Sequence, residues 1–129
     1  MILLDTHVIL WLTGDPQKIS QRALDAVKEA RGGNGIAISP ISFYEIARLI
    51  VRKRIEIDSP LESYLRQLET LFQVRPITVS ISLIAGQLPD HFPGDPADRI
   101  ITATALAENI PLVTADRRIR LSRAVKTIW

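Results

Sequence analysis

Short apolar runs alternate along the chain with longer segments whose apolar residues recur at helical spacing. Runs of Ile, Leu, Val and Ala predict buried β-strands at residues 2–4, 36–38 and 112–114. A weaker strand is predicted at 74–79, which Pro76 interrupts, and an edge strand at 125–128.

Between these runs the apolar period changes to that of helices. Helices are predicted at residues 19–30, 42–50, 61–72, 80–88 and 96–108. Strands that alternate with helices and lack hairpin signals favour a mostly parallel sheet covered on both faces. We therefore expect a three-layer α/β/α fold with a sheet of four to five strands.

Composition narrows the class of protein. A chain of 129 residues with 47% hydrophobic residues can close the core of one domain spanning 1–129. The absence of Cys excludes disulfides, Cys-type zinc sites and thiol nucleophiles. The apolar first twelve residues lack a basic leader and are too short to cross a bilayer, which predicts a cytoplasmic protein with no membrane contact.

Basic residues are clustered although the formal net charge is only +2. Twelve of the 16 basic residues are Arg, which suits bidentate contact with phosphate. One cluster is Arg48, Arg52, Lys53 and Arg54, and a second occupies residues 117–126. Such clusters are typical of solvated faces, but contact with an acidic polymer is the functional alternative.

Carboxylates stand where predicted strands end or helices begin. They are Asp5, Glu45, Asp95, Asp98 and Asp116. In a parallel sheet these positions share the carboxyl edge, where ligands bind. Two unit charges about 4 Å apart repel by about 4 kcal/mol at an effective dielectric constant near 20, so a hard divalent cation such as Mg²⁺ or Mn²⁺ would relieve the conflict. Such a site predicts a metal-dependent phosphodiesterase.

Each acid also has a structural interpretation as a helix cap. The acid after the first strand could close a turn or cap the next helix. Ser42 and Glu45 fit a capping box, and Asp95 before Pro96 fits an N-cap that puts Asp98 in the first helical turn. Asp116 could cap the turn that follows it. Both interpretations stay open at this point.

Several neighbours could support the acidic site. Thr6 and Thr114 could hold carboxylates or a metal-bound water by hydrogen bonds. Arg99 could contact phosphate or pair with an acid. His7 and His91 lie near the predicted site, where a lone His is more often a hydrogen-bonding residue than a metal ligand.

Three segments carry a resemblance that covers almost the whole chain. They are LLDTHVILWL at 3–12, ISPISFYEIA at 38–47 and HFPGDPADRIITATALAENIPLVTAD at 91–116. In this order and spacing they resemble the PIN-domain ribonucleases, in particular the VapC-type toxins of bacterial and archaeal toxin–antitoxin pairs. The resemblance implies a Mg²⁺- or Mn²⁺-dependent endoribonuclease with a PIN-like fold.

The resemblance also assigns roles to the acids. Asp5, Glu45 and Asp98 match the three main acids of the family, which bind metal and act in catalysis. Asp116 matches the fourth, whose contact with metal varies. Asp95 matches an extra acid of the subgroup with a D-P-x-D-R pattern and is a further candidate ligand.

Partners are implied by the resemblance alone. They are an RNA substrate, a second copy of the chain in a homodimer, and a small cognate antitoxin of the VapB type whose C-terminal segment crosses the active-site groove. Promoter DNA would be bound only through the antitoxin. Trp11 and Tyr44 are candidates for core, dimer or antitoxin contacts.

Other classes with an acidic pocket fit less well. A phosphorelay receiver domain needs adjacent acids after the first strand and a Lys near the last, whereas this chain has only Asp5 there and Lys126 comes too late. A haloacid-dehalogenase-like phosphatase needs D-x-D, which Asp5-Thr6-His7 lacks. A non-catalytic PIN-like RNA-binding or scaffold protein is the remaining alternative.

Overall fold

A five-stranded parallel sheet forms the centre of the computed structural model, which describes residues 1–129. Its strands are β1 (Ile2–Leu4), β2 (Ile36–Ile38), β3 (Gln73–Val74), β4 (Leu112–Val113) and β5 (Thr127–Ile128). Their order is β3-β2-β1-β4-β5, and every neighbouring pair is parallel. The predicted parallel α/β sheet is therefore confirmed.

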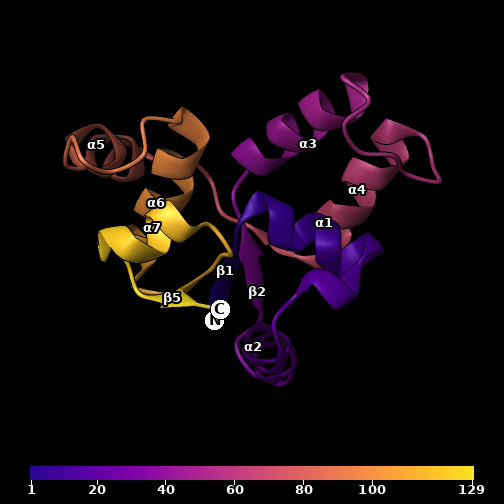
Figure 1. Cartoon of the computed structure of the whole chain (residues 1–129), viewed down its shortest axis with the longest axis horizontal. Helices are drawn as coiled ribbons and strands as arrows, with labels where there is room; N and C mark the ends of the chain where they lie inside the picture. The colour runs from indigo at the N-terminus through magenta and orange to yellow at the C-terminus, as the bar shows by residue number, and fades with distance from the viewer.

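Helices cover both faces of the sheet (Figure 1). One layer comprises α1 (Thr6–Gly14), α2 (Gln21–Gly32), α3 (Ile41–Val51) and α4 (Leu61–Leu71). The other comprises α5 (Val79–Gln87), α6 (Pro96–Glu108) and α7 (Arg117–Ser122). Ile2 and Leu4 belong to the core under the first layer and Leu3 to the core under the second, because successive strand residues face opposite sides.

Two helices and a 3₁₀ turn were absent from the sequence-based prediction. The unpredicted α1 follows β1 almost directly, and its residues Val8 to Leu10 are buried. Its uninterrupted apolar run has no polar stripe, so periodicity could not separate a buried helix from a strand. The six-residue α7 and the 3₁₀ turn Pro16–Lys18 are too short to show a period.

The strand predicted at 74–79 is wrong beyond its first residue. Only Gln73 and Val74 belong to β3. Pro76 has no N–H to donate to a sheet. Thr78 then caps α5, since its Oγ1 accepts a hydrogen bond of 3.2 Å from the backbone N–H of Ile81. The chain thus leaves the sheet early.

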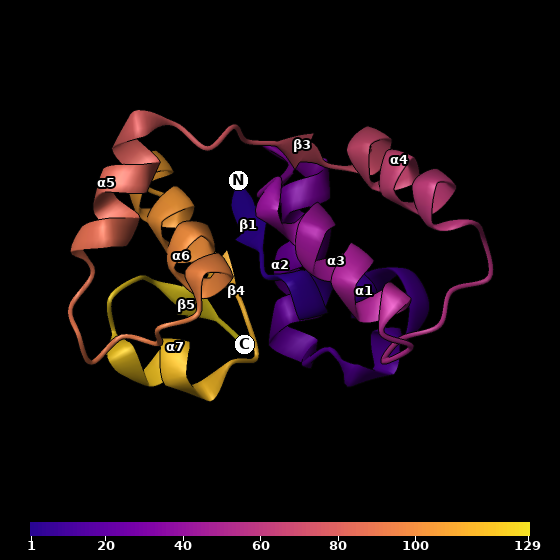
Figure 2. The ribbon, with the colours of Figure 1, turned by 90° about the horizontal axis from the view of Figure 1, so that it is seen from above.

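The strand order reverses direction at β1. The chain builds β2 and β3 on one side of β1 and then returns to add β4 and β5 on the other side, so helices α1–α4 and α5–α7 lie on opposite sides of β1 (Figure 2). In open parallel sheets the crevice at such a switch point is where ligands bind. Here it lies between the carboxyl ends of β1 and β4.

None of the helices is both long enough and apolar enough to cross a lipid bilayer.

A left-handed residue ends α3. The backbone N–H groups of Lys53 and Arg54 donate to the carbonyl oxygens of Ile50 and Leu49 at 3.0 and 2.9 Å, which is the hydrogen-bond pattern of a Schellman motif. Lys53 has a φ of 57°, a conformation usually left to glycine. The motif reverses the chain directly after the helix.

We expect Lys53→Gly to raise the free energy of unfolding by about 0.5–1 kcal/mol, because glycine relieves the left-handed strain but loses more chain entropy on folding. Denaturant unfolding of both proteins measures this. Asn109→Gly is the matched control, since Asn109 has a similar φ of 53° but is a residue type that tolerates it, so its change should be smaller. A lower stability for Lys53→Gly would contradict the strain argument.

Candidate active site

A cavity of about 350 Å³ lies at the switch point of the sheet. All five acids singled out from the sequence line it, although they come from four separate segments. The lining residues are Asp5, His7, Trp11, Glu45, Asp95, Asp98, Ala115, Asp116 and Arg118. The predicted convergence of the carboxylates is therefore confirmed.

Asp5 is held at the floor of this cavity. It follows β1 and caps α1, with its Oδ1 accepting a hydrogen bond of 2.8 Å from the backbone N–H of Thr6. The hydroxyl of Thr114 donates to its Oδ2 at 2.7 Å. Asp5 is only 8% exposed, and this burial raises its pKa while the two hydrogen bonds oppose the increase.

Thr114 connects two of the acids. Its buried Oγ1 donates to Asp5 and accepts a hydrogen bond of 3.0 Å from the backbone N–H of Asp116. Asp116 in turn caps α7, because its Oδ1 accepts from the backbone N–H groups of Arg118 and Ile119 at 2.8 and 3.3 Å. The end of β4 and the start of α7 are thereby fixed against the end of β1.

Glu45 is positioned by side chains rather than by a capping box. Helix α3 starts at Ile41, and no side chain caps its N-terminus, so the predicted reciprocal pair of Ser42 and Glu45 is wrong. Ser42 is already inside the first turn and buried, where its Oγ lies 2.9 Å from Oγ1 of Thr6. Thr6 donates to Glu45 Oε1. Burial, and then the nearby charges of Asp5 and Asp95, raise the pKa of Glu45.

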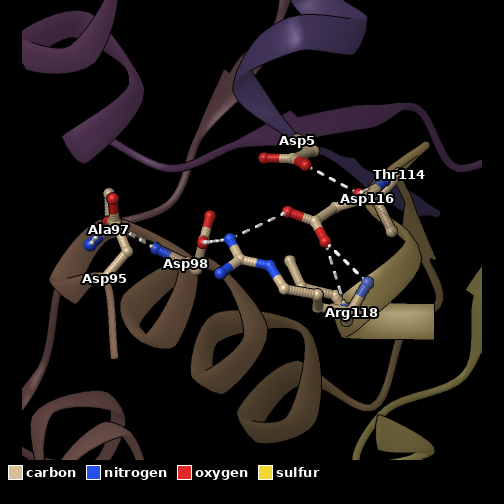
Figure 3. Close-up of polar contacts among 8 residues, drawn as sticks. Asp5, Asp95, Ala97, Asp98, Thr114, Asp116 and Arg118 are labelled. Atoms are coloured by element: carbon tan, nitrogen blue, oxygen red, sulfur yellow. Dashed lines mark hydrogen bonds and ion pairs between the residues drawn. The ribbon is translucent and has the colours of Figure 1, made fainter. Parts of the chain in front are cut away.

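The N-terminus of α6 brings two acids to the cavity. Asp95 is its N-cap, as predicted, with Oδ1 accepting from the backbone N–H groups of Ala97 and Asp98 at 2.8 and 3.3 Å (Figure 3). Asp98 follows in the first turn. Burial raises the pKa of Asp98 to about 7, and the charges of the other four acids add to the increase. Asp98 thus experiences the repulsion of the whole cluster.

Arg118 is a site residue that the sequence analysis missed. Its Nη2 lies 4.0 Å from Asp98 Oδ2 and 3.8 Å from Asp116 Oδ2, so one guanidinium group bridges two acids (Figure 3). The side chain is 71% exposed, which makes each ion pair weak. The only sign in the sequence that Arg118 reaches the site was its position two residues after Asp116, within the second basic cluster.

Arg99 is not at the site. Its Nε and Nη2 donate to the backbone carbonyl oxygens of Ala85 and Leu88 at 3.0 and 2.7 Å, and its guanidinium lies over the ring of Phe92. The ion pair with an acid, one of the two alternatives left open by the sequence, is absent, because Arg99 lies on the side of α6 that faces α5. Arg99 instead ties α6, which carries Asp98, to the preceding segment.

The two His residues differ in position. His7 lines the acidic cavity, and its ring packs 5.9 Å from that of Trp11. His91 is exposed in the loop before α6 and does not line the cavity. Only His7 therefore meets the expectation of a location at the site.

The donor chemistry of the cavity suits a hard divalent cation. Its acidic donors are all carboxylate oxygens, which Mg²⁺ and Mn²⁺ prefer. Burial and then the charges of the other acids raise the pKa of Asp98, and a cation would offset the second of these causes. No three acidic or His side chains stand close enough to surround an ion as they are placed. To surround a cation, the carboxylate side chains would have to turn inward. In this structure Arg118 balances part of their negative charge.

Comparison with known proteins agrees with the fold. The sequence model of the PIN domain matches residues 2–125. The chain is 41% identical to Ribonuclease VapC22 of Mycobacterium tuberculosis over 130 residues, which covers 99% of this chain and 98% of that protein.

Solved structures of the same fold are more distant in sequence. VapBC2 from Rickettsia felis, bound to a DNA fragment from its promoter, contains a chain with a TM-score of 0.73 and 19% identity, covering 98% of this chain and 97% of that one. VapBC-1 from nontypeable Haemophilus influenzae gives a TM-score of 0.72 and 19% identity, covering 98% and 96%. The expected PIN-like fold is thus confirmed.

The raised pKa of Asp98 predicts that the metal-free protein loses stability as the pH rises from about 4 to about 7. Between the unfolded pKa of 3.8 and the folded pKa of about 7, the folded state keeps a proton that the unfolded state has released. Asp98→Asn removes the charge, and should raise the free energy of unfolding at about pH 8 by on the order of 2 kcal/mol. Denaturant unfolding in EDTA at several pH values measures both effects. Asp90→Asn, at an exposed position outside the cavity, is the control.

A second prediction concerns the hydroxyl that holds Asp5. Thr114→Val removes a hydrogen bond to a buried carboxylate and should lower the free energy of unfolding by about 1.5–3 kcal/mol, whereas Thr114→Ser should retain most of it. Thr102→Val is the matched control, because Thr102 is equally buried and its hydroxyl has no hydrogen-bond partner. That control should be neutral or stabilising. Equal losses in the two Val variants would refute a specific role for the Thr114 hydroxyl.

Proposed function

Because this chain belongs to the PIN-domain family, in its VapC branch, we propose that it is a Mg²⁺- or Mn²⁺-dependent endoribonuclease and the toxin of a toxin–antitoxin pair. One observation carries the proposal: five carboxylates from separate segments meet in a single cavity at the switch point of the sheet. The relative at 41% identity is named a ribonuclease, which supports RNA as the substrate.

We assign metal binding to the carboxylates of the cavity. Asp5, Glu45, Asp98 and Asp116 would hold the ion, and Asp95 could join through Oδ2, which has no protein hydrogen-bond donor. When bound, Mg²⁺ or Mn²⁺ supplies activation of a water molecule and stabilisation of charge on the attacking and leaving oxygens of the phosphodiester.

The surrounding hydroxyls have an orienting role in this proposal. Thr6 donates to Glu45, and Thr114 donates to Asp5, so one oxygen of each carboxylate is fixed in direction. A carboxylate whose rotation is restricted in this way loses less freedom when it binds an ion. Both Thr residues are buried, which keeps water from competing for these bonds.

Arg118 is the residue that we assign to the substrate phosphate. It is the one Arg or Lys that lines the acidic cavity. Its ion pairs with Asp98 and Asp116 are weak and exposed, so the guanidinium can be released from these acids at little cost. The released guanidinium could then contact the phosphodiester by two parallel hydrogen bonds.

The partners follow from the same family. We propose a small VapB-type antitoxin as the protein partner, with promoter DNA bound through the antitoxin, and a homodimer as the assembly. Structural neighbours described as VapBC complexes, one of them with promoter DNA, support the antitoxin.

The test is RNA cleavage by the purified chain, freed of any bound antitoxin. We expect cleavage with Mg²⁺ or Mn²⁺ and none in excess EDTA. Asp5→Asn and Asp98→Asn should each reduce the rate at least about 100-fold, since each removes a ligand from an ion that supplies several kcal/mol of transition-state stabilisation. Gel analysis of labelled RNA fragments measures the rates.

Asp90→Asn controls for the loss of an Asp charge outside the cavity and should cleave at the wild-type rate. Unchanged cleavage in EDTA, or by the Asp98→Asn protein, would refute the metal mechanism. RNA binding without cleavage under every metal condition would instead favour a non-catalytic RNA-binding protein.

A further inference from the structure

A second groove, of about 490 Å³, adjoins the acidic cavity along α3. The two share His7, Glu45 and Asp95 in their walls, so they are continuous with one another. The rest of the groove differs sharply in charge from the acidic cavity. It is lined by the exposed residues Tyr44, Arg48, Arg52 and Arg54. We call this surface the α3 groove.

The three Arg residues of the α3 groove have no acidic partner. None of the ion pairs in the structure includes Arg48, Arg52 or Arg54. Arg48 and Arg52 are four residues apart on one face of α3, a spacing at which like charges destabilise a helix. No ion pair within the chain therefore accounts for their placement.

The turn after α3 adds the third Arg to the groove. A continued helix would turn residue 54 away from residues 48 and 52, because each residue advances the helix by about 100°. The Schellman motif at Lys53 reverses the chain instead, and Arg54 lines the same groove. This reversal requires Lys53 to adopt a left-handed backbone conformation, with a φ of 57°. Strained backbone that persists beside a cavity is a common mark of a functional surface.

Tyr44 places an aromatic ring in the same groove. Its side chain is 60% exposed, whereas the other Phe, Trp and Tyr side chains of the protein are buried or half-buried. The guanidinium of Arg48 lies 6.0 Å from the ring centroid, one turn further along α3. A stacking surface beside a row of unpaired guanidinium groups is the combination that proteins use to bind single-stranded nucleic acid.

We propose that the α3 groove binds single-stranded RNA next to the cleaved bond, with phosphates on Arg48, Arg52 and Arg54 and one base stacked on Tyr44. This proposal rests on the proposed function, since the acidic cavity would hold the cleaved phosphate. Glu45 and Arg52 are about 10 Å apart along α3, given a rise of 1.5 Å per residue, so the strand would run along the helix from the cavity. Unpaired RNA is favoured over a duplex because a base can reach Tyr44 only when it is unstacked from its neighbours.

Binding can be measured apart from cleavage. A short fluorescein-labelled RNA without self-complementarity is titrated with the full chain in EDTA, and fluorescence anisotropy gives the Kd at several salt concentrations. We expect Arg48→Ala, Arg52→Ala and Arg54→Ala each to weaken binding and to reduce the slope of log K against log salt by about 0.7, the value for one lost phosphate contact on a single strand.

Tyr44 is tested by two substitutions. Tyr44→Ala should weaken RNA binding roughly fivefold or more, whereas Tyr44→Phe should restore wild-type affinity, because a phenyl ring still stacks. Neither should change the slope with salt. A loss in both variants, or in neither, would contradict base stacking.

Arg22→Ala is the matched control for charge. Arg22 is exposed on α2 and lines neither the α3 groove nor the acidic cavity, so its removal should leave the Kd and the salt slope unchanged. An equal effect of Arg22→Ala would show nonspecific attraction and overturn the proposal. The proposal would also be overturned if duplex RNA bound the groove with the same affinity as single-stranded RNA. The same holds if the groove variants changed the sedimentation coefficient of the protein but not its RNA binding.

Cleavage assays separate this proposal from the function of the acidic cavity. If both hold, the Arg48, Arg52 and Arg54 triple Ala variant cleaves in Mg²⁺ with a raised KM and a kcat close to wild type. If that variant cleaved RNA at the wild-type rate with an unaltered KM, only the proposal that the α3 groove binds RNA would be overturned. If the groove variants weakened RNA binding but the wild-type protein showed no metal-dependent cleavage, the proposed nuclease function would be overturned and the proposed RNA-binding groove would stand.

Discussion

Mutual repulsion among five carboxylates is the constraint on which the rest of this structure depends. The order of the sheet puts Asp5 and Asp116 at the switch point, and α3 and α6 bring Glu45, Asp95 and Asp98 to the same cavity. The cost is visible in Asp98, whose pKa rises to about 7 because it is buried beside the other four. Three kinds of interaction partly offset this repulsion: contacts with helix N-termini, hydrogen bonds from buried hydroxyls, and the ion pairs of Arg118.

The helix-cap and metal-ligand interpretations of these acids are compatible. Asp95 and Asp116 each use Oδ1 to accept backbone N–H groups, which leaves Oδ2 directed elsewhere. Capping therefore stabilises the helix and fixes the carboxylate in direction at the same time. Asp5 differs, because both of its oxygens accept a hydrogen bond, Oδ1 from the N–H of Thr6 and Oδ2 from the hydroxyl of Thr114. An acid that caps a helix with one oxygen can therefore still offer its other oxygen to a cation.

The site was more predictable from the sequence than some of the elements that carry it. Each acid follows a strand or starts a helix, and one rule about parallel sheets placed all of them together. Helix α1 was missed because an apolar run has no period. The Ser42–Glu45 pairing was wrong because the N-cap of α3 is Pro40, two residues before Ser42. Arg118 and Arg99 show the main limit. Which Arg reaches the site depends on which side of a helix faces the cavity, and neighbouring acids in the sequence do not decide this.

The near balance of 16 basic and 14 acidic residues conceals a separation of charge over a short distance. The acidic cavity and the α3 groove share Glu45, yet one holds five carboxylates and the other three unpaired guanidinium groups. Without a cation the acids would repel a polyanion from the point where the Arg residues attract it. Divalent cations in the cavity would neutralise much of this negative charge, so the acids would no longer oppose a strand that the Arg residues attract. Metal binding and RNA binding should therefore be coupled, each increasing the affinity for the other.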